Sequence, residues 1–229
     1  MRLYRGRPKW WPNWSGETAV VVGAGPGATA EPLEPYRGRA RFITVNNSIA
    51  LAPWADVAYG CDARWWIEKG GLPDFIGLKI SQDPHLQGRF GVKFIRSTKG
   101  MARPDALMVG QPTLGWGGNG GFQAINLCIH FGVRKILLVG FTMHIRDGQN
   151  WHANHPWVDP FLELNMSRHR RAVDRAADTL QALGIETVNC TPNSALTRYR
   201  VSTLEKEFAD GKAEGPAEGA DQDICRLRG

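Results

Sequence analysis

The histidines between residues 144 and 155 form the densest group of chemically versatile side chains in the sequence. His152 and His155 stand three residues apart, and His144 precedes them in the same irregular segment. Two histidines at that spacing on a helix could bind a metal ion, with His144 or Asp147 as a third ligand. Because Pro156 opposes a helix here, we favour one histidine as a general base or as a partner for phosphate. The alternative is an ordinary surface loop.

A glycine-rich turn follows the first apolar run of the chain. The run Ala19–Val22 stops at Gly23, and the turn continues through Gly25, Pro26 and Gly27. Backbone N–H groups at such a strand–turn–helix junction bind phosphate, and proline suits the first helical position. The turn fits the dinucleotide-binding fingerprint, although the same glycines are also expected in a tight turn that binds nothing.

Neutral amides follow the second predicted strand. Residues 41–45 run into Asn46 and Asn47, where an NAD site requires an acidic residue for the ribose. The pair therefore disfavours a dehydrogenase and favours a nucleotide or sugar-nucleotide. Asp62 follows the third predicted strand and could bind magnesium or a ribose, or it could cap the helix predicted over residues 63–68.

A second glycine-rich segment, residues 115–121, leads into a predicted helix. Gly118, Asn119 and Gly120 lie at the junction, where backbone amides and the asparagine side chain could approach a phosphate. The alternative is a flexible loop in which Asn119 only caps the helix.

Strand-like runs alternate with helix-like segments along most of the chain. This alternation predicts an α/β, Rossmann-like fold, with a mostly parallel doubly wound sheet and helices on both faces. Ligands bind beyond the carboxyl ends of such strands, so we expect the polar residues described above to meet there. The predicted strands are residues 19–22, 41–45, 57–59, 76–80, 92–95, 135–139 and 186–188, and the clearest helices are 119–131 and 161–183.

Composition places the chain among ordinary water-soluble proteins. It has 229 residues, and no apolar run approaches the ~20 residues needed to span a bilayer. Four scattered cysteines disfavour a disulfide framework and favour the cytoplasm. We predict a single nucleotide-binding domain over residues 18–208, preceded by an arm (1–17) and followed by a disordered tail (209–229).

The arm is basic and aromatic. Its first 16 residues contain four arginines and lysines, no acidic residue and three tryptophans, Trp10, Trp11 and Trp14. Such a segment could contact nucleic acid or an anionic sugar-nucleotide. The favoured alternative is that the tryptophans pack on the domain.

The ordered motifs VVGAGPGA, VNNS, GGNGGFQAINLCIHFGVRKILLVGFTM and IETVNCTPNSAL resemble a known group. They are similar, over residues 18–200, to the Rossmann-type proteins that include the bacterial sialyltransferases. The chain also resembles the archaeal-type 6-hydroxymethylpterin diphosphokinase domain and uncharacterised phage proteins. The resemblance to the transferases implies that Gly23–Gly27 and Asn46 or Asn47 hold a cytidine nucleotide. It also implies that Gly118–Gly121 lie against the donor and that His152 or His155 acts as the base.

These observations lead to three hypotheses. The first is a glycosyltransferase-like enzyme that moves a group from a sugar-nucleotide to an acceptor hydroxyl, with magnesium as an optional partner. The second is pyrophosphoryl transfer from ATP, which requires magnesium and would depend on Asp62. The third is a non-catalytic phage accessory protein, associated with nucleic acid, that keeps the fold; a phage-encoded protein would act in the cytoplasm of its host.

Overall fold

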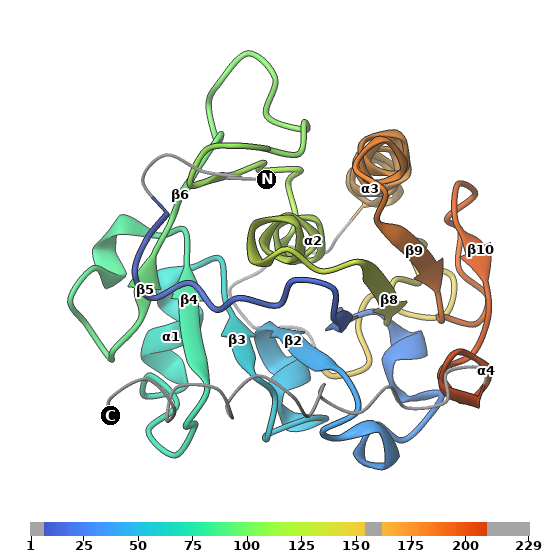
Figure 1. Cartoon of the computed structure of the whole chain (residues 1–229), viewed down its shortest axis with the longest axis horizontal. Helices are drawn as coiled ribbons and strands as arrows, with labels where there is room; N and C mark the ends of the chain where they lie inside the picture. The colour runs from blue at the N-terminus through green and yellow to red at the C-terminus, as the bar shows by residue number, and fades with distance from the viewer. Residues whose placement is uncertain (1–6, 154–161, 210–229) are drawn as a thin grey trace, which may run out of the picture.

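The computed structural model describes residues 7–153 and 162–209, and its centre is a parallel sheet in the order β10-β9-β8-β1-β2-β3-β4-β5 (Figure 1). A separate parallel pair joins β6 to β7. The strands of the main sheet are β1 (Thr18–Val22), β2 (Arg41–Val45), β3 (Val57–Tyr59), β4 (Leu78–Ser81), β5 (Lys93–Phe94), β8 (Lys135–Val139), β9 (Glu186–Asn189) and β10 (Arg200–Val201), and the small pair is β6 (Arg96–Ser97) and β7 (Thr113–Leu114).

The order in which successive strands are added to the sheet reverses at β1. From β1 the chain proceeds through β2 and β3 toward one edge, and it returns to place β8 on the other side of β1. Val22 at the end of β1 pairs with Val139 of β8 and with Thr44 of β2. In open α/β sheets the crevice beyond such a reversal is where ligands bind. The carboxyl ends of β1, β2 and β8 are therefore the place to look for a site.

Both faces of the sheet are covered, as Figure 1 shows. Along β1, Ala19 and Val21 join a core cluster with α2 and α3, whereas Val20 and Val22 join a second cluster with α1 and α4. This period of two is what a buried central strand requires. The predicted doubly wound α/β fold is confirmed. The helices are α1 (Ala63–Glu68), α2 (Gly120–Phe131), α3 (Glu163–Ala182) and α4 (Leu204–Ala209), with 3-10 turns η1 (Pro26–Thr29), η2 (Glu34–Tyr36), η3 (Asn46–Ala50) and η4 (Pro84–Leu86).

The described part of the arm packs against α2. Trp11 is stacked on His130 with ring centroids 4.8 Å apart, and Trp14 meets Phe131 edge-on at 4.7 Å. Both tryptophans are buried in the core cluster beside α2. This agrees with the packing alternative for these two tryptophans.

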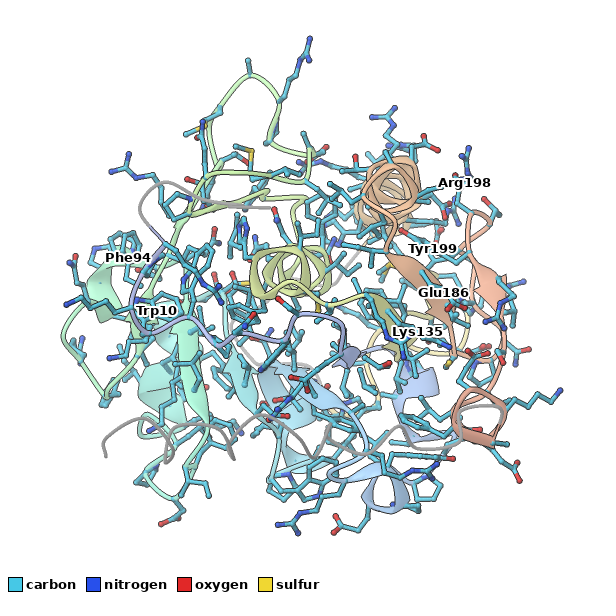
Figure 2. The ribbon with its side chains drawn as sticks, viewed as in Figure 1. Trp10, Phe94, Lys135, Glu186, Arg198 and Tyr199 are labelled. Carbon is cyan, nitrogen blue, oxygen red and sulfur yellow. The ribbon has the colours of Figure 1, made fainter. Side chains whose placement is uncertain are left out.

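Ion pairs gather at the amino ends of the strands on the β8–β10 side. Lys135 and Glu186 begin β8 and β9 and lie beside each other (Figure 2), with 3.5 Å between Nζ and a carboxylate oxygen. Glu207 of α4 lies 2.8 Å from Lys135 Nζ and 2.7 Å from Arg200 Nη1. This network fixes α4, an element that the sequence did not predict, against the edge of the sheet.

Some of the connections contain short regular elements. The two 3-10 turns η1 and η2 each have a proline in their first turn. Thr113–Leu114 pairs with Arg96–Ser97. The predicted disordered tail lies outside the described residues, apart from Ala209. Within the described ranges, no helix is both long and apolar enough to cross a membrane.

Candidate functional site at the carboxyl edge of the sheet

The first glycine turn is joined to the loop that follows β8. The N–H of Gly23 donates to the carbonyl of Val139 at 2.7 Å, and that of Gly25 donates to the carbonyl of Gly140 at 2.9 Å. Gly27 N–H donates to the hydroxyl of Thr142 at 3.1 Å. These bonds hold the two loops together across the reversal point of the sheet.

Close approach of the two loops explains why glycine is needed in this turn. A Cβ on Gly25 would lie 2.7 Å from the carbonyl oxygen of Gly140 and 2.8 Å from the hydroxyl oxygen of Thr142.

The protein itself uses three of the four N–H groups in Gly23–Gly27, and among the described residues only that of Ala24 has no partner. Pro26 begins η1, as predicted, but η1 has only four residues and so contributes little dipole.

The two asparagines after β2 are held differently. Asn46 has a positive φ of 51°, and its Oδ1 is buried without a hydrogen-bond partner among the described residues. Asn47 Oδ1 accepts a hydrogen bond of 2.9 Å from the indole N–H of Trp65 on α1. That bond orients the Asn47 amide, so its Nδ2 points toward the loop after β8.

His152 lies against Asn47. Its Nδ1 is 3.2 Å from Asn47 Nδ2 and 2.7 Å from the carbonyl oxygen of Ala153. The shorter contact assigns the Nδ1 proton, which is donated to Ala153, and leaves the lone pair on Nε2. The neighbouring Trp151 donates its backbone N–H to the carbonyl of Ala24 at 3.0 Å and its indole N–H to Ser48 at 3.2 Å. The histidine loop therefore contacts both the glycine turn and the asparagine turn.

The structure separates the roles of the predicted histidines. His144 is buried, and its Nε2 lies 2.8 Å from the carbonyl oxygen of Asn193, so it connects the loops after β8 and β9. Its Nδ1 is buried without a partner among the described residues. His155 lies outside the described residues.

The start of α2 reaches the same edge. Asn119 caps the helix by accepting the N–H of Phe122 at 2.8 Å, as predicted, and Gly132 ends it with a φ of 88°. A Cβ on Gly120 would lie 2.7 Å from Val45, the last residue of β2. The N–H groups of Gly120 and Gly121 have no hydrogen-bond partner among the described residues. They are the free donors of a twelve-residue helix beside the asparagine turn.

A buried glutamine fixes the start of α2. Gln123 accepts hydrogen bonds from the hydroxyl of Tyr59 and the thiol of Cys61, at the end of β3 and just after it. Its Nε2 donates to the carbonyl of Trp116 at 2.8 Å. Burial raises the pKa values of Tyr59 and Cys61 far above their ordinary range, so both remain neutral donors.

His169 of α3 lies beside the second glycine-rich segment, a position that the sequence did not predict. Its ring would lie 3.2 Å from a Cβ on Gly118, which has a φ of 73°. Burial and the charge of Arg168 lower the pKa of His169 to about 4. Arg168 lies over the ring of Trp116 at 4.6 Å. One sequence feature could have identified His169: it lies three or four residues from apolar positions of α3. That spacing predicts an inward-facing side chain.

Asp62 is exposed at the cap position of α1 but makes no capping hydrogen bond. Asp83 does this instead, since its carboxylate accepts the N–H of Ala63 at 2.9 Å. Across residues 7–153 and 162–209, no group of three or more histidine, cysteine or acidic side chains has the arrangement of a metal site.

Comparison with known proteins adds evidence on the fold. No family model and no curated protein matches the sequence. The sialyltransferase CstII from Campylobacter jejuni, solved with the substrate analogue cytidine-5'-monophosphate, is similar with a TM-score of 0.53 and 9% identity over 82% of this chain and 85% of that chain. Its structure with CMP-3FNeuAc gives a TM-score of 0.50 and 10% identity over 81% and 85%. The chain thus has a sialyltransferase-like α/β fold.

Proposed function

We propose that the protein is a sugar-nucleotide-dependent transferase whose donor site lies at the carboxyl ends of β1, β2 and β8. The observation that carries the proposal is convergence: the two glycine-rich segments, the asparagine turn and His152 meet at the reversal point of the sheet. The similarity of the fold to a sialyltransferase solved with CMP supports a cytidine nucleotide as the first donor to test.

In this proposal the donor phosphate binds at the start of α2. The free N–H groups of Gly120 and Gly121 and the helix dipole favour an anion there. The Ala24 N–H adds a donor from the first glycine turn. The unpartnered Oδ1 of Asn46 would accept a hydrogen bond from the ribose or the base. Backbone donors of this kind also stabilise the charge that develops on a leaving phosphate.

His152 is the proposed base. Its Nε2 would take the proton of the acceptor hydroxyl as the new glycosidic bond forms and the nucleotide leaves with the electrons of the broken bond. The hydrogen bond from Nδ1 to the Ala153 carbonyl orients the ring. His169 is neutral at pH 7 and would act as a hydrogen-bond donor toward the bound anion. Asp62 alone does not make a magnesium site, so no step depends on that ion.

A thermal-shift series tests the donor class, with CMP, a CMP-linked sugar, UDP, GDP and ATP, each with and without magnesium. We expect CMP and the CMP-linked sugar to stabilise the protein, by about 2.7 kcal/mol at a hundredfold excess over Kd. Asn46→Ala should abolish most of that shift, whereas Asn13→Ala, which replaces an exposed asparagine of the arm, should keep it. No shift with any nucleotide would contradict the proposal. A shift only with ATP and magnesium would favour pyrophosphoryl transfer.

A further inference from the structure

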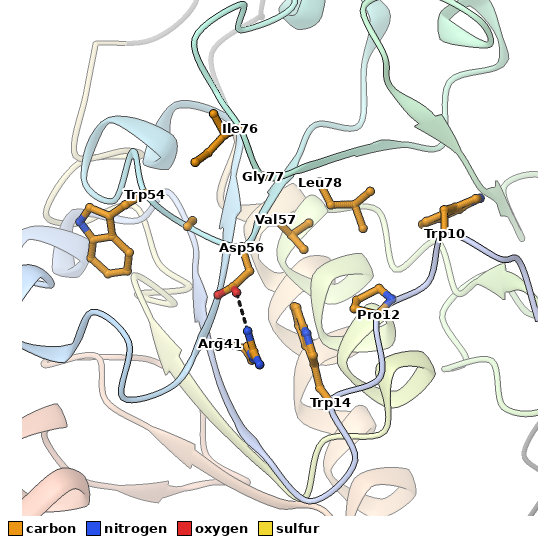
Figure 3. A pocket seen from close by; sticks show the side chains of 11 residues that line it. Trp10, Pro12, Trp14, Arg41, Trp54, Asp56, Val57, Ile76, Gly77 and Leu78 are labelled. Atoms are coloured by element: carbon orange, nitrogen blue, oxygen red, sulfur yellow. Dashed lines mark hydrogen bonds and ion pairs between the residues drawn. The ribbon is translucent and has the colours of Figure 1, made fainter. Parts of the chain in front are cut away.

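A cavity of about 430 Å³ opens on the opposite edge of the sheet, at the amino ends of β2, β3 and β4 (Figure 3). The first residues of these strands, Arg41, Val57 and Leu78, contribute to its wall. Its volume falls within the range of small-molecule sites, which runs from about 300 to 1,000 Å³. Neither the glycine turns nor His152 lines it, so it is separate from the proposed donor site.

Tryptophan side chains line much of this cavity. Trp14 is buried, with 3% of its surface exposed, whereas Trp10 and Trp54 are half-buried and lie on opposite sides of the cavity in Figure 3. Ile76 at the cavity is 99% exposed. Indole rings are large apolar surfaces that usually bury themselves or serve binding. Trp10 and Trp54 therefore keep part of their ring surfaces accessible at the cavity.

A fixed ion pair provides the polar groups of the cavity. Arg41 donates to Asp56 at 3.1 Å, which Figure 3 draws as a dashed line, and to Glu17 at 2.6 and 3.3 Å. Asp56 also accepts the N–H of Phe42 at 2.8 Å. Among the described residues, these bonds use three of the five guanidinium N–H groups and about half of the lone pairs of Asp56. The pair therefore keeps both donors and acceptors for a ligand.

The charges in this group disfavour an ionic ligand. A phosphate or carboxylate would meet the carboxylates of Asp56 and Glu17, and a cation would meet the guanidinium of Arg41. A neutral ligand with hydroxyl groups matches the unused donors and acceptors, because a hydroxyl both donates and accepts. A pyranose ring combines such hydroxyls with an apolar C–H face that stacks on indole.

We propose that this cavity is a second binding site, for a neutral mono- or disaccharide unit of a glycan. The sugar ring stacks on Trp54 or Trp10, and its hydroxyls bond to Arg41 and Asp56. Gly77 shapes the wall, because a Cβ there would lie 2.7 Å from the carbonyl oxygen of Ala55. This site goes beyond the proposed transferase function and does not depend on it.

Saturation-transfer NMR and calorimetry on the full chain test the site with lactose, cellobiose and N,N′-diacetylchitobiose as probes. We expect at least one disaccharide to bind at millimolar concentration, and Trp54→Ala to weaken that binding about tenfold or more, given the contact area of an indole. Trp116→Ala, which removes an indole just before α2, is the matched control. We expect it to leave the affinity for the disaccharide unchanged. CMP should not displace the disaccharide.

Trp10→Ala provides a second variant if Trp54→Ala melts below the assay temperature. The proposal is overturned if no disaccharide binds, or if binding survives both tryptophan variants in folded protein. It is also overturned if CMP competes with the disaccharide for the cavity. Binding of the cation choline in the cavity, without binding of any of the sugars, would overturn it as well. An Asn46→Ala protein that no longer binds CMP should still bind the disaccharide, because the two sites are separate.

Discussion

The two edges of the sheet carry different kinds of polar chemistry. At the carboxyl ends of β1, β2 and β8 most of the polar groups are neutral amides, hydroxyls and imidazoles, and several of their atoms have no partner among the described residues. At the amino ends the polar groups are charged and bonded to one another, as in Arg41 with Asp56 and Lys135 with Glu207. The first edge thus keeps free donors and acceptors for an anionic ligand.

The two edges therefore differ in how much of their polar chemistry the protein itself uses. A charge that is already paired contributes to stability, and removal of its partner is costly. A buried polar atom without a partner costs stability unless a ligand completes its bonding, as would apply to Asn46 Oδ1.

The largest effect is expected for His152→Ala. We expect turnover of a CMP-linked sugar to fall about 10²- to 10⁴-fold, because a positioned base contributes that much. The thermal shift with CMP should stay unchanged, since the donor groups remain. His85→Ala, which replaces an exposed histidine paired with Asp83, is the control and should keep full turnover. Equal turnover in the two variants would remove His152 from the mechanism.

The next effect concerns the ion pairs of the amino edge. Hydrogen bonds from Arg200 and Lys135 lower the pKa of Glu207 to about 2, and its side chain is only 5% exposed. Glu207→Gln should lower the free energy of unfolding at pH 7 by about 3 kcal/mol, measured by urea denaturation. Glu205→Gln, exposed on the same helix, should change it little.

The Glu207 carboxylate also makes the free energy of unfolding depend on pH. Because its folded pKa lies below the unfolded value near 4.5, its contribution is complete above that pH. The contribution is lost as the pH falls from about 4.5 to 2. Wild-type protein should lose its advantage over Glu207→Gln across this window. A constant difference between the two proteins would show that the ion pairs do not stabilise α4.

Two glycine substitutions compare the edges directly. In Gly25→Ala and Gly77→Ala the new Cβ meets a carbonyl oxygen at 2.7 Å in each case. Each should destabilise the protein by about 1–3 kcal/mol, as overpacking does. Gly25→Ala should weaken CMP binding only, and Gly77→Ala disaccharide binding only, both measured by calorimetry. If either change weakens both ligands, the two edges are coupled.

The smallest effect concerns His169 and is a change in how steeply the free energy of unfolding depends on pH. His169 has a pKa of about 4 in the folded protein, below its ordinary 6.5, so the folded state loses stability as the pH falls from about 6.5 to 4. His169→Gln should reduce this slope by at most one proton, about 1.4 kcal/mol per pH unit. His130, whose pKa burial also lowers to about 4, lies under Trp11 and serves for comparison.

Bound CMP should reduce the part of the pH dependence of unfolding that comes from His169, because an anion beside His169 stabilises its charged form. The part that comes from His130 should stay unchanged. Urea denaturation with and without CMP measures this difference. An equal response of the two histidines would place the nucleotide away from α3.

Local patterns predicted the strands well. The ranges Arg41–Val45, Val57–Tyr59 and Lys135–Val139 are the observed strands, and α1 spans the predicted residues. Each is a short apolar run bounded by turn residues, so the necessary information is local. The two-residue β10 is too short to show a period. α4 was missed because it is held by the ion pair between Glu207 and Lys135, which lie far apart in the sequence.

The candidate site was predicted only in part. The sequence pointed to the glycine turns, the asparagines and the histidine segment, but it did not distinguish His144, which joins two loops, from His152, which lies at the asparagine turn. Nor did it indicate that the first glycine turn uses most of its N–H groups to bond the loop after β8. His169 was missed because it lies on α3, far in sequence from the glycine-rich segment that it meets in the fold.

The sequence by itself determined the order and type of the main elements, because apolar periodicity, caps and glycine stops act over a few residues. Tertiary structure decided which polar residues meet and which are already bonded. The contact between Asn47 and His152 joins residues 105 positions apart, and the bond from Gly27 to Thr142 spans 115. Such pairs depend on how the whole sheet is wound, and no local pattern encodes them.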